Sequence, residues 1–293
     1  MNKSASTTPK TVSFPWIVEN YDVILFDAYG VLVNGSGAID GAVGALDLLK
    51  KQKKNYLILT NGATRTIPIM AKRYQQKGLD IPENKIFSSG SRLFHAFRNL
   101  GLIQPKCLVL GPESSHDLVR ENGGKVLSLD SIESNYNEVD ALVIANQSGY
   151  PFEKTLNDII NFLFYRYDNS SLPSLIVANC DLLYPYSDHK FGITAGAAYL
   201  IIKGALQHRY PGVDFDFHLI GKPSSYLFEA AKSLYKNSKM IMIGDQLQTD
   251  ILGANSAGIH SALISTGLCN WKKANHEQID DFPTYLIPNL LLT

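Results

Sequence analysis

Several features that would define other classes of protein are missing from this sequence. No apolar run approaches the roughly 18–20 residues that are needed to span a bilayer. Lys plus Arg and Asp plus Glu both number 27, so no excess charge of one sign favours nucleic acid or an anionic membrane. The three cysteines, at 107, 180 and 269, include no CxxC pair, which argues against a disulfide framework. We therefore expect a cytoplasmic protein with neither a membrane nor a nucleic acid as partner.

The start of the chain also lacks the features of a secretion signal. The segment MNKSASTTPKTVSFP has no apolar core, and its many Ser and Thr without acids would also suit an organelle transit peptide. We expect residues 1–17 to form a disordered tail instead. With 293 residues and 45% hydrophobic composition, the chain as a whole is long enough to bury a sizeable core.

Short apolar runs alternate with amphipathic segments along the rest of the chain. The runs predict buried strands at 22–26, 56–59, 106–110, 141–144, 174–177, 217–220 and 240–243. Helices are predicted between them, including 41–51, 68–77, 152–165, 225–236 and 251–257. Such alternation is typical of an α/β fold with a doubly wound, mainly parallel sheet. The three strands that end near 111, 145 and 178 carry little charge and could form a second, inserted sheet.

Polar residues gather just beyond four of the predicted strands. Asp27, Thr60, Lys222 and Asp245 each follow such a strand, and ligands bind at the carboxyl edge of open α/β sheets. A carboxylate at the end of a buried strand is costly unless it is paired. Asp245 and Asp250 are five residues apart between a strand and a helix, a spacing that suits either a helix cap or oxygen ligands of Mg²⁺. These positions predict one polar site at one sheet edge.

A cation and an anion-binding loop complete the predicted site. Lys222 alone would be a solvated side chain, but beside several carboxylates it would balance their charge and hold a phosphoryl oxygen. Thr60, Asn61 and Gly62 offer a hydroxyl and main-chain N–H groups, which bind anion oxygens well. The sequence therefore indicates phosphate chemistry at this edge.

Together these four clusters resemble the motifs of the haloacid dehalogenase (HAD) superfamily. The layout is most similar to class IIA, the NagD-like branch of phosphatases, in which Leu-Thr-Asn-Gly and Gly-Lys-Pro flank an inserted α/β cap. The stretch Ile-Gly-Asp-Gln-Leu-Gln-Thr-Asp is close to that branch's fourth motif. The resemblance extends from about Asp22 to Gly267. It implies a Rossmann-like catalytic core at 18–104 and 215–293, and a substrate-selecting cap at 105–214.

The resemblance implies a magnesium-dependent phosphatase that acts on a small phosphomonoester such as a sugar phosphate or nucleotide. Asp27 would be the nucleophile and form an aspartyl-phosphate. Mg²⁺ would be held by Asp27, the Tyr29 carbonyl, Asp245 and Asp250. The equatorial phosphoryl oxygens would contact the second- and third-motif residues, which are Thr60, Asn61, Gly62 and Lys222. Relatives of this kind commonly dimerise through the cap, which leaves a homodimer open.

One further position adds to the resemblance, and another departs from it. Asp181 occupies the place of the cap aspartate in relatives with Asn-Pro-Asp, so it is a candidate substrate contact, although it would equally suit a turn. Tyr29 occupies the place of the second aspartate that protonates the leaving group, and a phenol with a reference pKa of about 10 is a poor base at neutral pH. Tyr29 is thus a candidate acid. It also leaves two alternatives open: a 2-haloacid dehalogenase, and a catalytically weak binding or regulatory protein.

Overall fold

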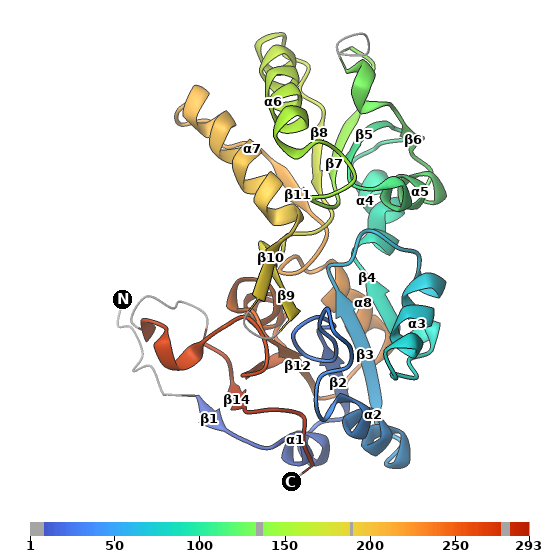
Figure 1. Ribbon diagram of the computed structural model, residues 1–293, viewed down its shortest axis with the longest axis vertical. Helices are drawn as coiled ribbons and strands as arrows, with labels where there is room; N and C mark the ends of the chain where they lie inside the picture. The colour runs from blue at the N-terminus through green and yellow to red at the C-terminus, as the bar shows by residue number, and fades with distance from the viewer. Residues whose placement is uncertain (1–8, 133–136, 188–189, 277–281, 293) are drawn as a thin grey trace.

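The computed structural model describes residues 9–132, 137–187, 190–276 and 282–292. Within these ranges the chain forms two parallel sheets, one above the other along the long axis of the molecule, with an antiparallel hairpin between them (Figure 1). The lower sheet is the core and the upper sheet is the cap. Both are covered by helices, which confirms the expected doubly wound α/β architecture.

The core sheet has seven strands among the described residues, in the order β1-β14-β13-β12-β2-β3-β4, and all neighbours are parallel. Its strands are β1 (Lys10–Thr11), β2 (Val23–Phe26), β3 (Asn55–Thr60), β4 (Ile86–Ser88), β12 (Met240–Gly244), β13 (His260–Ile264) and β14 (Tyr285–Ile287). The central position of β2, between β12 and β3, brings strands from both ends of the chain together.

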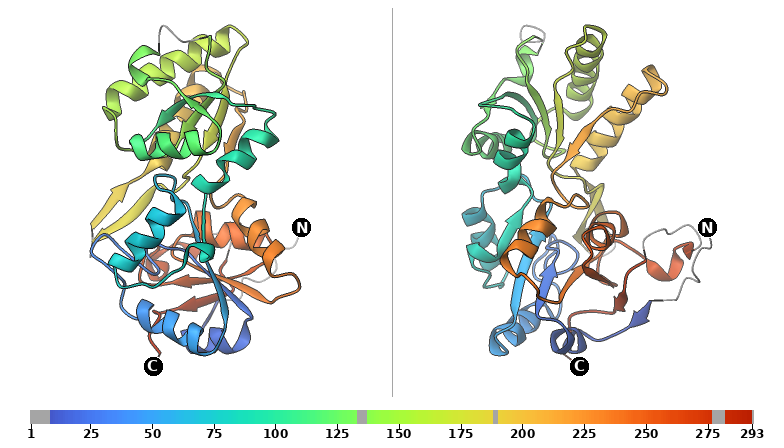
Figure 2. Two further views of the ribbon diagram at one scale, coloured as in Figure 1. Left: turned by 90° about the vertical axis from the view of Figure 1, so that its right-hand side faces the viewer. Right: turned by 180° about the vertical axis from the view of Figure 1, so that it is seen from behind.

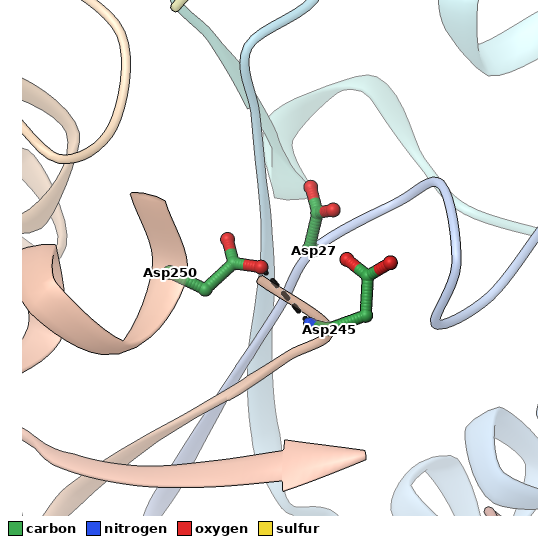
Figure 3. Close-up of side chains that lie close together, drawn as sticks. All are labelled: Asp27, Asp245 and Asp250. Carbon is green, nitrogen blue, oxygen red and sulfur yellow. Dashed lines mark hydrogen bonds between the residues drawn. The ribbon is translucent and has the colours of Figure 1, made fainter. Parts of the chain in front are cut away.

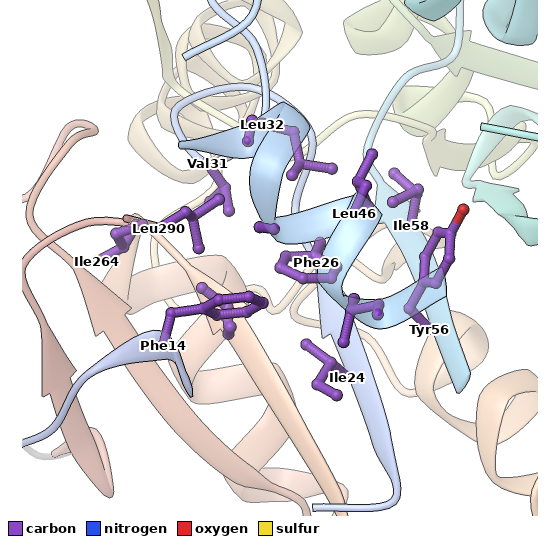
Figure 4. Packing of buried hydrophobic residues seen from close by; sticks show 14 of the residues in the cluster. Phe14, Ile24, Phe26, Val31, Leu32, Leu46, Tyr56, Ile58, Ile264 and Leu290 are labelled. Atoms are coloured by element: carbon purple, nitrogen blue, oxygen red, sulfur yellow. The ribbon is translucent and has the colours of Figure 1, made fainter. Parts of the chain in front are cut away.

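Alternation along β2 divides the core into two apolar layers. Ile24 and Phe26 point to one face, where Phe14 and Leu46 pack against them (Figure 4), while Val23 and Leu25 point to the other. The first face is covered by α1 (Phe14–Asn20), α2 (Ala42–Lys51) and α3 (Ile67–Gln76). The second is covered by α8 (Tyr226–Leu234) and α9 (Leu252–Ser256). Burial on both faces explains why these strands are apolar without interruption.

The cap sheet has five parallel strands within the described ranges, in the order β11-β8-β7-β5-β6. They are β5 (Lys106–Leu110), β6 (Lys125–Val126), β7 (Ala141–Ile144), β8 (Ser174–Val177) and β11 (Phe217–Leu219). Helices α6 (Phe152–Asp168) and α7 (Ala195–Arg209) pack on one face, and α4 (Leu93–Asn99) and α5 (Glu113–Glu121) on the other.

A hairpin of β9 (Leu183–Ser187) and β10 (Lys190–Ile193) extends from the cap to the core (Figures 1 and 2). It lies against the loop that follows β2. The approach is close enough that a Cβ at Gly35 would collide with the main-chain oxygen of Tyr186. The hairpin thus contacts the same edge of the core that carries the predicted site residues.

Three of the expected boundaries are wrong. Helix α4 packs on the cap sheet, so the first core segment does not extend to residue 104. Residues 10–11 pair with β14, and α1 begins at Phe14, whose side chain is fully buried, so the disordered tail does not extend to residue 17. Residues 1–8 lie outside the described part of the chain. Residues 217–219 pair with β8 in the cap sheet, so the second core segment does not begin at 215. Burial of Phe14 and pairing of β11 are both tertiary effects that local composition does not reveal.

The predicted strands and helices otherwise correspond to observed elements, with small shifts at their ends. The helix expected at 251–257 begins earlier, as a π-helix at Leu247–Ile251 that continues into α9. Among the described helices, none is long and apolar enough to cross a membrane.

Candidate active site

The first two site residues come from neighbouring strands of the core sheet. Asp27 follows β2 and Asp245 follows β12, and these strands pair in parallel. The main-chain N–H of Asp27 donates to the carbonyl of Ile243 at 2.9 Å, which extends the pairing beyond the end of β2. Parallel pairing with this register places both carboxylates at one edge, as the sequence predicted.

Three carboxylates converge at this edge (Figure 3). One oxygen each from Asp27, Asp245 and Asp250 lies within 4.8 Å of the others. The exposed fraction is 4% for Asp27 and 0% for the other two. Burying three like charges together is costly unless cations and hydrogen bonds compensate.

The π-helix turns Asp250 back toward the end of β12. Its Oδ2 accepts hydrogen bonds from the main-chain N–H groups of Asp245, at 3.0 Å, and Gln246, at 3.2 Å. π-helical turns often occur at functional sites because the extra residue redirects a side chain. The spacing of five residues between Asp245 and Asp250 is therefore used to place both carboxylates on one side of the strand end.

Two glycines make room for Asp245. A Cβ at Gly30 or at Gly267 would collide with its carboxylate, and Gly30 also has a positive φ of 89°. Asp245 Oδ2 accepts from the main-chain N–H of Leu268 at 2.8 Å. Its Oδ1 is buried and has no hydrogen-bond partner among the described residues. The carboxylate is thus held firmly while one oxygen faces the cluster unpaired.

Lys222 pairs with two of the three carboxylates. Its Nζ donates to Asp27 Oδ1 and to Asp250 Oδ1, both at 2.6 Å, and the side chain is 1% exposed. Burial alone would lower the pKa of Lys222, but Asp250, Asp27 and Asp181 outweigh burial and raise it. The lysine is therefore a permanent cation that offsets part of the acidic charge.

One lysine does not neutralise the cluster. Burial raises the pKa of Asp27 to about 7, with Asp250 and Asp181 adding to the effect and Lys222 opposing it. Burial, Asp27 and Asp250 together raise the pKa of Asp245 well above its usual range. With one buried oxygen of Asp245 unpaired, this donor set fits an additional hard cation, because hard cations take carboxylate oxygens as ligands.

The predicted anion loop follows β3 beside this cluster. Thr60 Oγ1 accepts from the N–H of Gly62 at 3.2 Å, which leaves its hydroxyl proton available to a ligand. Asn61 is 1% exposed, and its Oδ1 accepts from the N–H of Lys222 at 2.6 Å. Its Nδ2 donates to the carbonyl of Lys222 and to Asp181 Oδ1, each at 2.9 Å. Asn61 therefore connects the core lysine to the cap.

A cavity of about 310 Å³ lies above the acidic cluster, between core and cap. It is lined by Asp27, Tyr29, Thr60, Asn61, Gly62 and Asp181 among others, so the structure brings these predicted residues to one space. Asp181 is fixed by its own loop: its N–H donates to Asn179 Oδ1 at 2.9 Å. The Tyr29 ring packs edge-on against Tyr184 of the hairpin, with centroids 6.3 Å apart.

The sequence reasoning missed several residues that line this cavity. Arg65, in the loop after β3, and Gln147, in the loop after β7, were not candidates, and neither was Tyr184. Arg65 could have been noticed as a lone cation three residues after Gly62. No local signal marks Gln147 or Tyr184, because their place over the core depends on how the cap is docked.

Comparison with known proteins agrees with this geometry. A family model described as haloacid dehalogenase-like hydrolase matches residues 24–125, and a second HAD hydrolase-like model matches 219–292. A solved structure described as a possible sugar phosphatase of the HAD superfamily, from Cytophaga hutchinsonii, is 31% identical with a TM-score of 0.84. That comparison covers 97% of this chain and 99% of the other.

Two more distant proteins are similar over most of their length. The glycerol-3-phosphate phosphatase of Rattus norvegicus is 23% identical over 93% of this chain and 88% of its own. NagD from Escherichia coli K-12 has the same fold, with a TM-score of 0.70 at 18% identity, covering 93% of this chain and 98% of that one. The inserted α/β cap and the order of the four motifs agree with these similarities. The chain therefore belongs to the haloacid dehalogenase superfamily of hydrolases, in its class IIA, NagD-like branch.

Proposed function

We propose that this chain is a magnesium-dependent phosphatase that hydrolyses a small phosphomonoester through an aspartyl-phosphate on Asp27. The observation that carries the proposal is the convergence of three buried carboxylates, one with an unpaired oxygen, at one sheet edge, where a lysine pairs with two of them. The family membership supports hydrolysis, and the named relative that acts on glycerol 3-phosphate supports a small ester as substrate.

Asp27, Asp245 and Asp250 would hold the cation, together with the main-chain carbonyl of Tyr29. Three carboxylates and a carbonyl form an all-oxygen donor set, which Mg²⁺ prefers. When bound, such a cation disperses the negative charge of the phosphoryl oxygens. It would also keep Asp27 ionised, which burial otherwise opposes.

Asp27 is the proposed nucleophile. Lys222 holds its Oδ1 at 2.6 Å, and no described residue donates to its Oδ2. Oδ2 can therefore attack phosphorus while the P–O bond to the leaving group breaks and the leaving oxygen takes a proton. Water then attacks the phosphorus of the aspartyl-phosphate, which releases inorganic phosphate and restores the Asp27 carboxylate.

The phosphoryl oxygens would meet donors from two loops. Thr60 can donate its hydroxyl proton, and Lys222 adds its positive charge beside Asp27. Both amide hydrogens of Asn61 are already engaged by Lys222 and Asp181. Its side chain is therefore proposed to hold Lys222 and the cap in place. The main-chain N–H groups of the loop are proposed to contact the phosphate.

Tyr29 is the proposed acid for the leaving group. Its ring lines the cavity and contacts Tyr184 of the hairpin, so the phenol is at the boundary between core and cap. A phenol can donate a proton but is a weak base near neutrality. We infer that Tyr29 gives the attacking water little general-base assistance in the second step. The enzyme is therefore expected to act on esters with good leaving groups, or to turn over slowly.

The cap is proposed to select the leaving group. Asp181 reaches the core through Asn61 and lines the same cavity as Asp27. A homodimer through the cap and a cytoplasmic location also belong to this proposal. Exposed apolar side chains on the hairpin, such as Tyr186 and Phe191, support the homodimer. Three free cysteines support the cytoplasmic location.

Hydrolysis of p-nitrophenyl phosphate with and without Mg²⁺ tests the proposal. We expect turnover that depends on Mg²⁺, disappears in EDTA and returns on adding the metal. Full hydrolysis in EDTA would exclude the proposed cation dependence. If the folded protein with Mg²⁺ binds phosphate esters but turns over none, the binding or regulatory alternative would be correct. Release of halide from a 2-haloacid would support the dehalogenase alternative, which the acidic triad disfavours because that chemistry needs no cation.

A further inference from the structure

The edge of the core sheet opposite the acidic cluster carries lysines. All neighbouring strands of this sheet are parallel, so their amino ends share one edge, far from the cavity. Lys54, Lys85 and Lys239 directly precede β3, β4 and β12. This edge faces the end of the molecule where α2 lies, away from the cap (Figure 1). The two edges of one sheet therefore carry side chains of opposite charge.

Two hollows open along this amino edge. The first, of about 380 Å³, is lined by α2, the segment after it and residues 78–85, and the second, of about 450 Å³, by residues 232–240 and 258–260. Only two described lining residues are acidic, Asp47 and Asp80. Against them stand seven lysines: Lys50, Lys53, Lys54, Lys85, Lys232, Lys236 and Lys239. Because the whole chain has no net charge, this excess of positive charge is a local feature.

The two hollows adjoin each other. Lys85 of the first donates from Nζ to the hydroxyl of Tyr235 in the second, at 3.1 Å. Lys54 of the first donates to the main-chain carbonyl of Tyr21 at 2.9 Å, and Lys239 of the second lies over the ring of Tyr21, 4.6 Å from its centroid. The seven lysines thus belong to one continuous surface, which we call the basic face.

Most of the positive charge on the basic face is not neutralised. Lys50 pairs with Asp80 at 3.2 Å and Lys232 with Glu229 at 3.0 Å, and both lysines lie in the last turn of a helix, where a cation is favourable. The others have no carboxylate partner among the described residues: Lys53, Lys54, Lys85, Lys236 and Lys239. Like charges that gather without counterions create a local positive potential, which attracts an anionic partner.

The first hollow also has an apolar floor. Leu46, Leu49 and Leu79 are buried beneath it, and Val43 at its side is 46% exposed. An apolar side chain that enters this hollow would be removed from water, while carboxylates beside it would meet the lysines. An apolar floor within a basic surface therefore fits an acidic peptide that carries an apolar residue.

Two other polyanionic partners fit less well. Nucleic acid is bound through arginines and through open aromatic rings on which bases stack. No arginine lines either hollow in the described part of the chain, and the rings of Tyr21 and Tyr56 are 1% and 9% exposed, each with a lysine ammonium over it. A membrane surface takes apolar side chains that protrude, whereas the leucines here lie beneath the floor of a hollow.

We propose that the basic face docks an acidic segment of a partner protein, with carboxylates at the lysines and one apolar side chain in the first hollow. The proposal goes beyond the phosphatase function and does not depend on it. Because the basic face and the cavity lie at opposite edges of the core sheet, a docked partner leaves the cavity open. The protein is thus expected to keep its activity while it is bound.

Fluorescence anisotropy tests the docking with a short labelled peptide of Asp and Glu that has one central Leu. The peptide should bind at about 0.01 M salt and weaken steeply towards about 0.15 M, as the screening length falls from about 30 to 8 Å. A peptide with Asn and Gln in place of the acids should not bind. Replacing the central Leu by Gly should weaken binding by about 10-fold, because the apolar contact is lost.

Charge reversal locates the binding surface. Lys53→Glu combined with Lys236→Glu changes one exposed lysine without a carboxylate partner in each hollow, and should weaken binding by at least about 10-fold. Lys72→Glu combined with Lys125→Glu is the matched control, since both lysines are exposed and line neither hollow. If the control pair loses as much affinity as the first pair, the attraction is a diffuse field effect and the proposal is wrong.

Val43→Gln tests the apolar contact. Val43 is exposed on α2 and lines the first hollow, so the change adds polarity there without opening the core. The variant should bind the Leu peptide and the Gly peptide with nearly equal affinity while it retains the dependence on salt. An unchanged preference for the Leu peptide would show that its apolar residue does not enter this hollow, and would overturn the proposed mode of docking.

Further outcomes would assign the basic face to another partner. Tighter binding of oligouridylate, or of phosphatidylcholine vesicles that contain phosphatidylserine, would make the partner a nucleic acid or a membrane. No binding of the peptide at about 1 mM and low salt, where attraction is least screened, would exclude docking.

Competition with inorganic phosphate distinguishes the basic face from the catalytic site. Phosphate with Mg²⁺ should not displace the peptide, and the peptide should not inhibit hydrolysis of p-nitrophenyl phosphate. Displacement by phosphate that Lys53→Glu with Lys236→Glu leaves unchanged would place the peptide at the cavity instead, and the proposal would be wrong. Since anisotropy needs no turnover, a protein that hydrolyses no ester but binds the peptide would refute the proposed function and support the docking face.

Discussion

The core edge and the cap edge, which meet at the cavity, differ in the charge and chemistry of the side chains that they present. At the core edge, Asp27, Asp245 and Asp250 are buried beside one lysine, and main-chain N–H groups hold two of them in place. At the cap edge, Asp181 is the one charged lining residue among the described residues, while the other strand ends present neutral amides and hydroxyls and the hairpin presents aromatic rings. The core therefore concentrates charge, whereas the cap offers mainly shape and neutral hydrogen bonds beside the single carboxylate of Asp181.

This difference indicates where substrate specificity can change without loss of catalytic activity. The core cluster is rigid and interdependent, since removing one charge leaves others buried without a partner. The cap residues contact the core through few bonds, such as the one from Asn61 to Asp181. We expect changes in the core to alter the rate of every reaction and changes in the cap to alter the choice among substrates.

The largest expected effect follows from replacing the nucleophile. Asp27→Asn keeps the shape of the side chain but cannot form the acyl phosphate, so turnover should fall by about 10³-fold or more on all esters. Steady-state kinetics measure the loss, and circular dichroism checks the fold. Asp47→Asn, an exposed position on α2, is the matched control. Retention of more than a few per cent of activity would remove Asp27 from the nucleophilic role.

Asp245→Asn should weaken the cation site next most strongly. The unpaired oxygen of Asp245 is proposed to contact the cation directly, so the Kd for Mg²⁺ should rise by at least about 10-fold, the lower end found even for outer-shell partners. Titration calorimetry measures this, and the rise in Tm that Mg²⁺ produces should shrink in parallel. Unchanged Mg²⁺ affinity would place the cation elsewhere. We expect the weaker Mg²⁺ binding to lower the activity to the same extent on every substrate, because Asp245 lies in the core.

Tyr29→Asp should increase turnover at the boundary between the two regions. A carboxylic acid at this position could protonate the departing alkoxide and then assist the attacking water, which is worth up to about 10²-fold. The gain should be larger for alkyl phosphates than for p-nitrophenyl phosphate, whose leaving group needs little protonation. Loss of the ring contact with Tyr184 and added repulsion near Asp27 oppose the gain. If the variant folds, binds Mg²⁺ and gains nothing on either ester, Tyr29 does not limit the rate.

The smallest and most selective effect is expected from the cap. Asp181→Asn keeps a side chain that can accept from Asn61 but removes the charge from the cavity, so relative kcat/KM values across a panel of esters should change by about 10-fold. The rate with p-nitrophenyl phosphate serves as the reference for each ratio. An equal loss on all substrates would mean that Asp181 supports the core machinery, and the contrast between core and cap would then not hold at this residue.

Much of the core could be predicted because its signals are local. Continuous apolar runs predicted β2, β3 and β12, since strands covered on both faces need apolar residues throughout. The residues after them were predicted to meet because parallel strands end at the same edge. The acidic triad is the direct result, and the structure brings all three members within 4.8 Å.

Other elements carried weak or misleading signals. Helix α1 has a readable start, with Ser13 accepting from the N–H of Trp16 and proline in its first turn, but the Ser/Thr-rich start of the chain suggested disorder. Strand β1 has two residues, both exposed, and it exists because β14 provides a partner. The hairpin β9–β10 contains a proline and was not predicted, since edge strands tolerate proline and lack regular alternation.

The sequence by itself determined the reactive groups of this protein and their order. Asp27, Thr60, Lys222 and the Asp245–Asp250 pair lie at the ends of apolar strands, and that placement results from local apolar patterning and strand topology. Only the tertiary structure decided which oxygen of Asp245 stays unpaired, that Asn61 joins Lys222 to Asp181, and that Arg65 and Gln147 face one cavity. These features depend on how the cap packs against the core. This packing depends on many weak contacts between segments that are distant in the sequence, and local sequence patterns do not reveal such contacts.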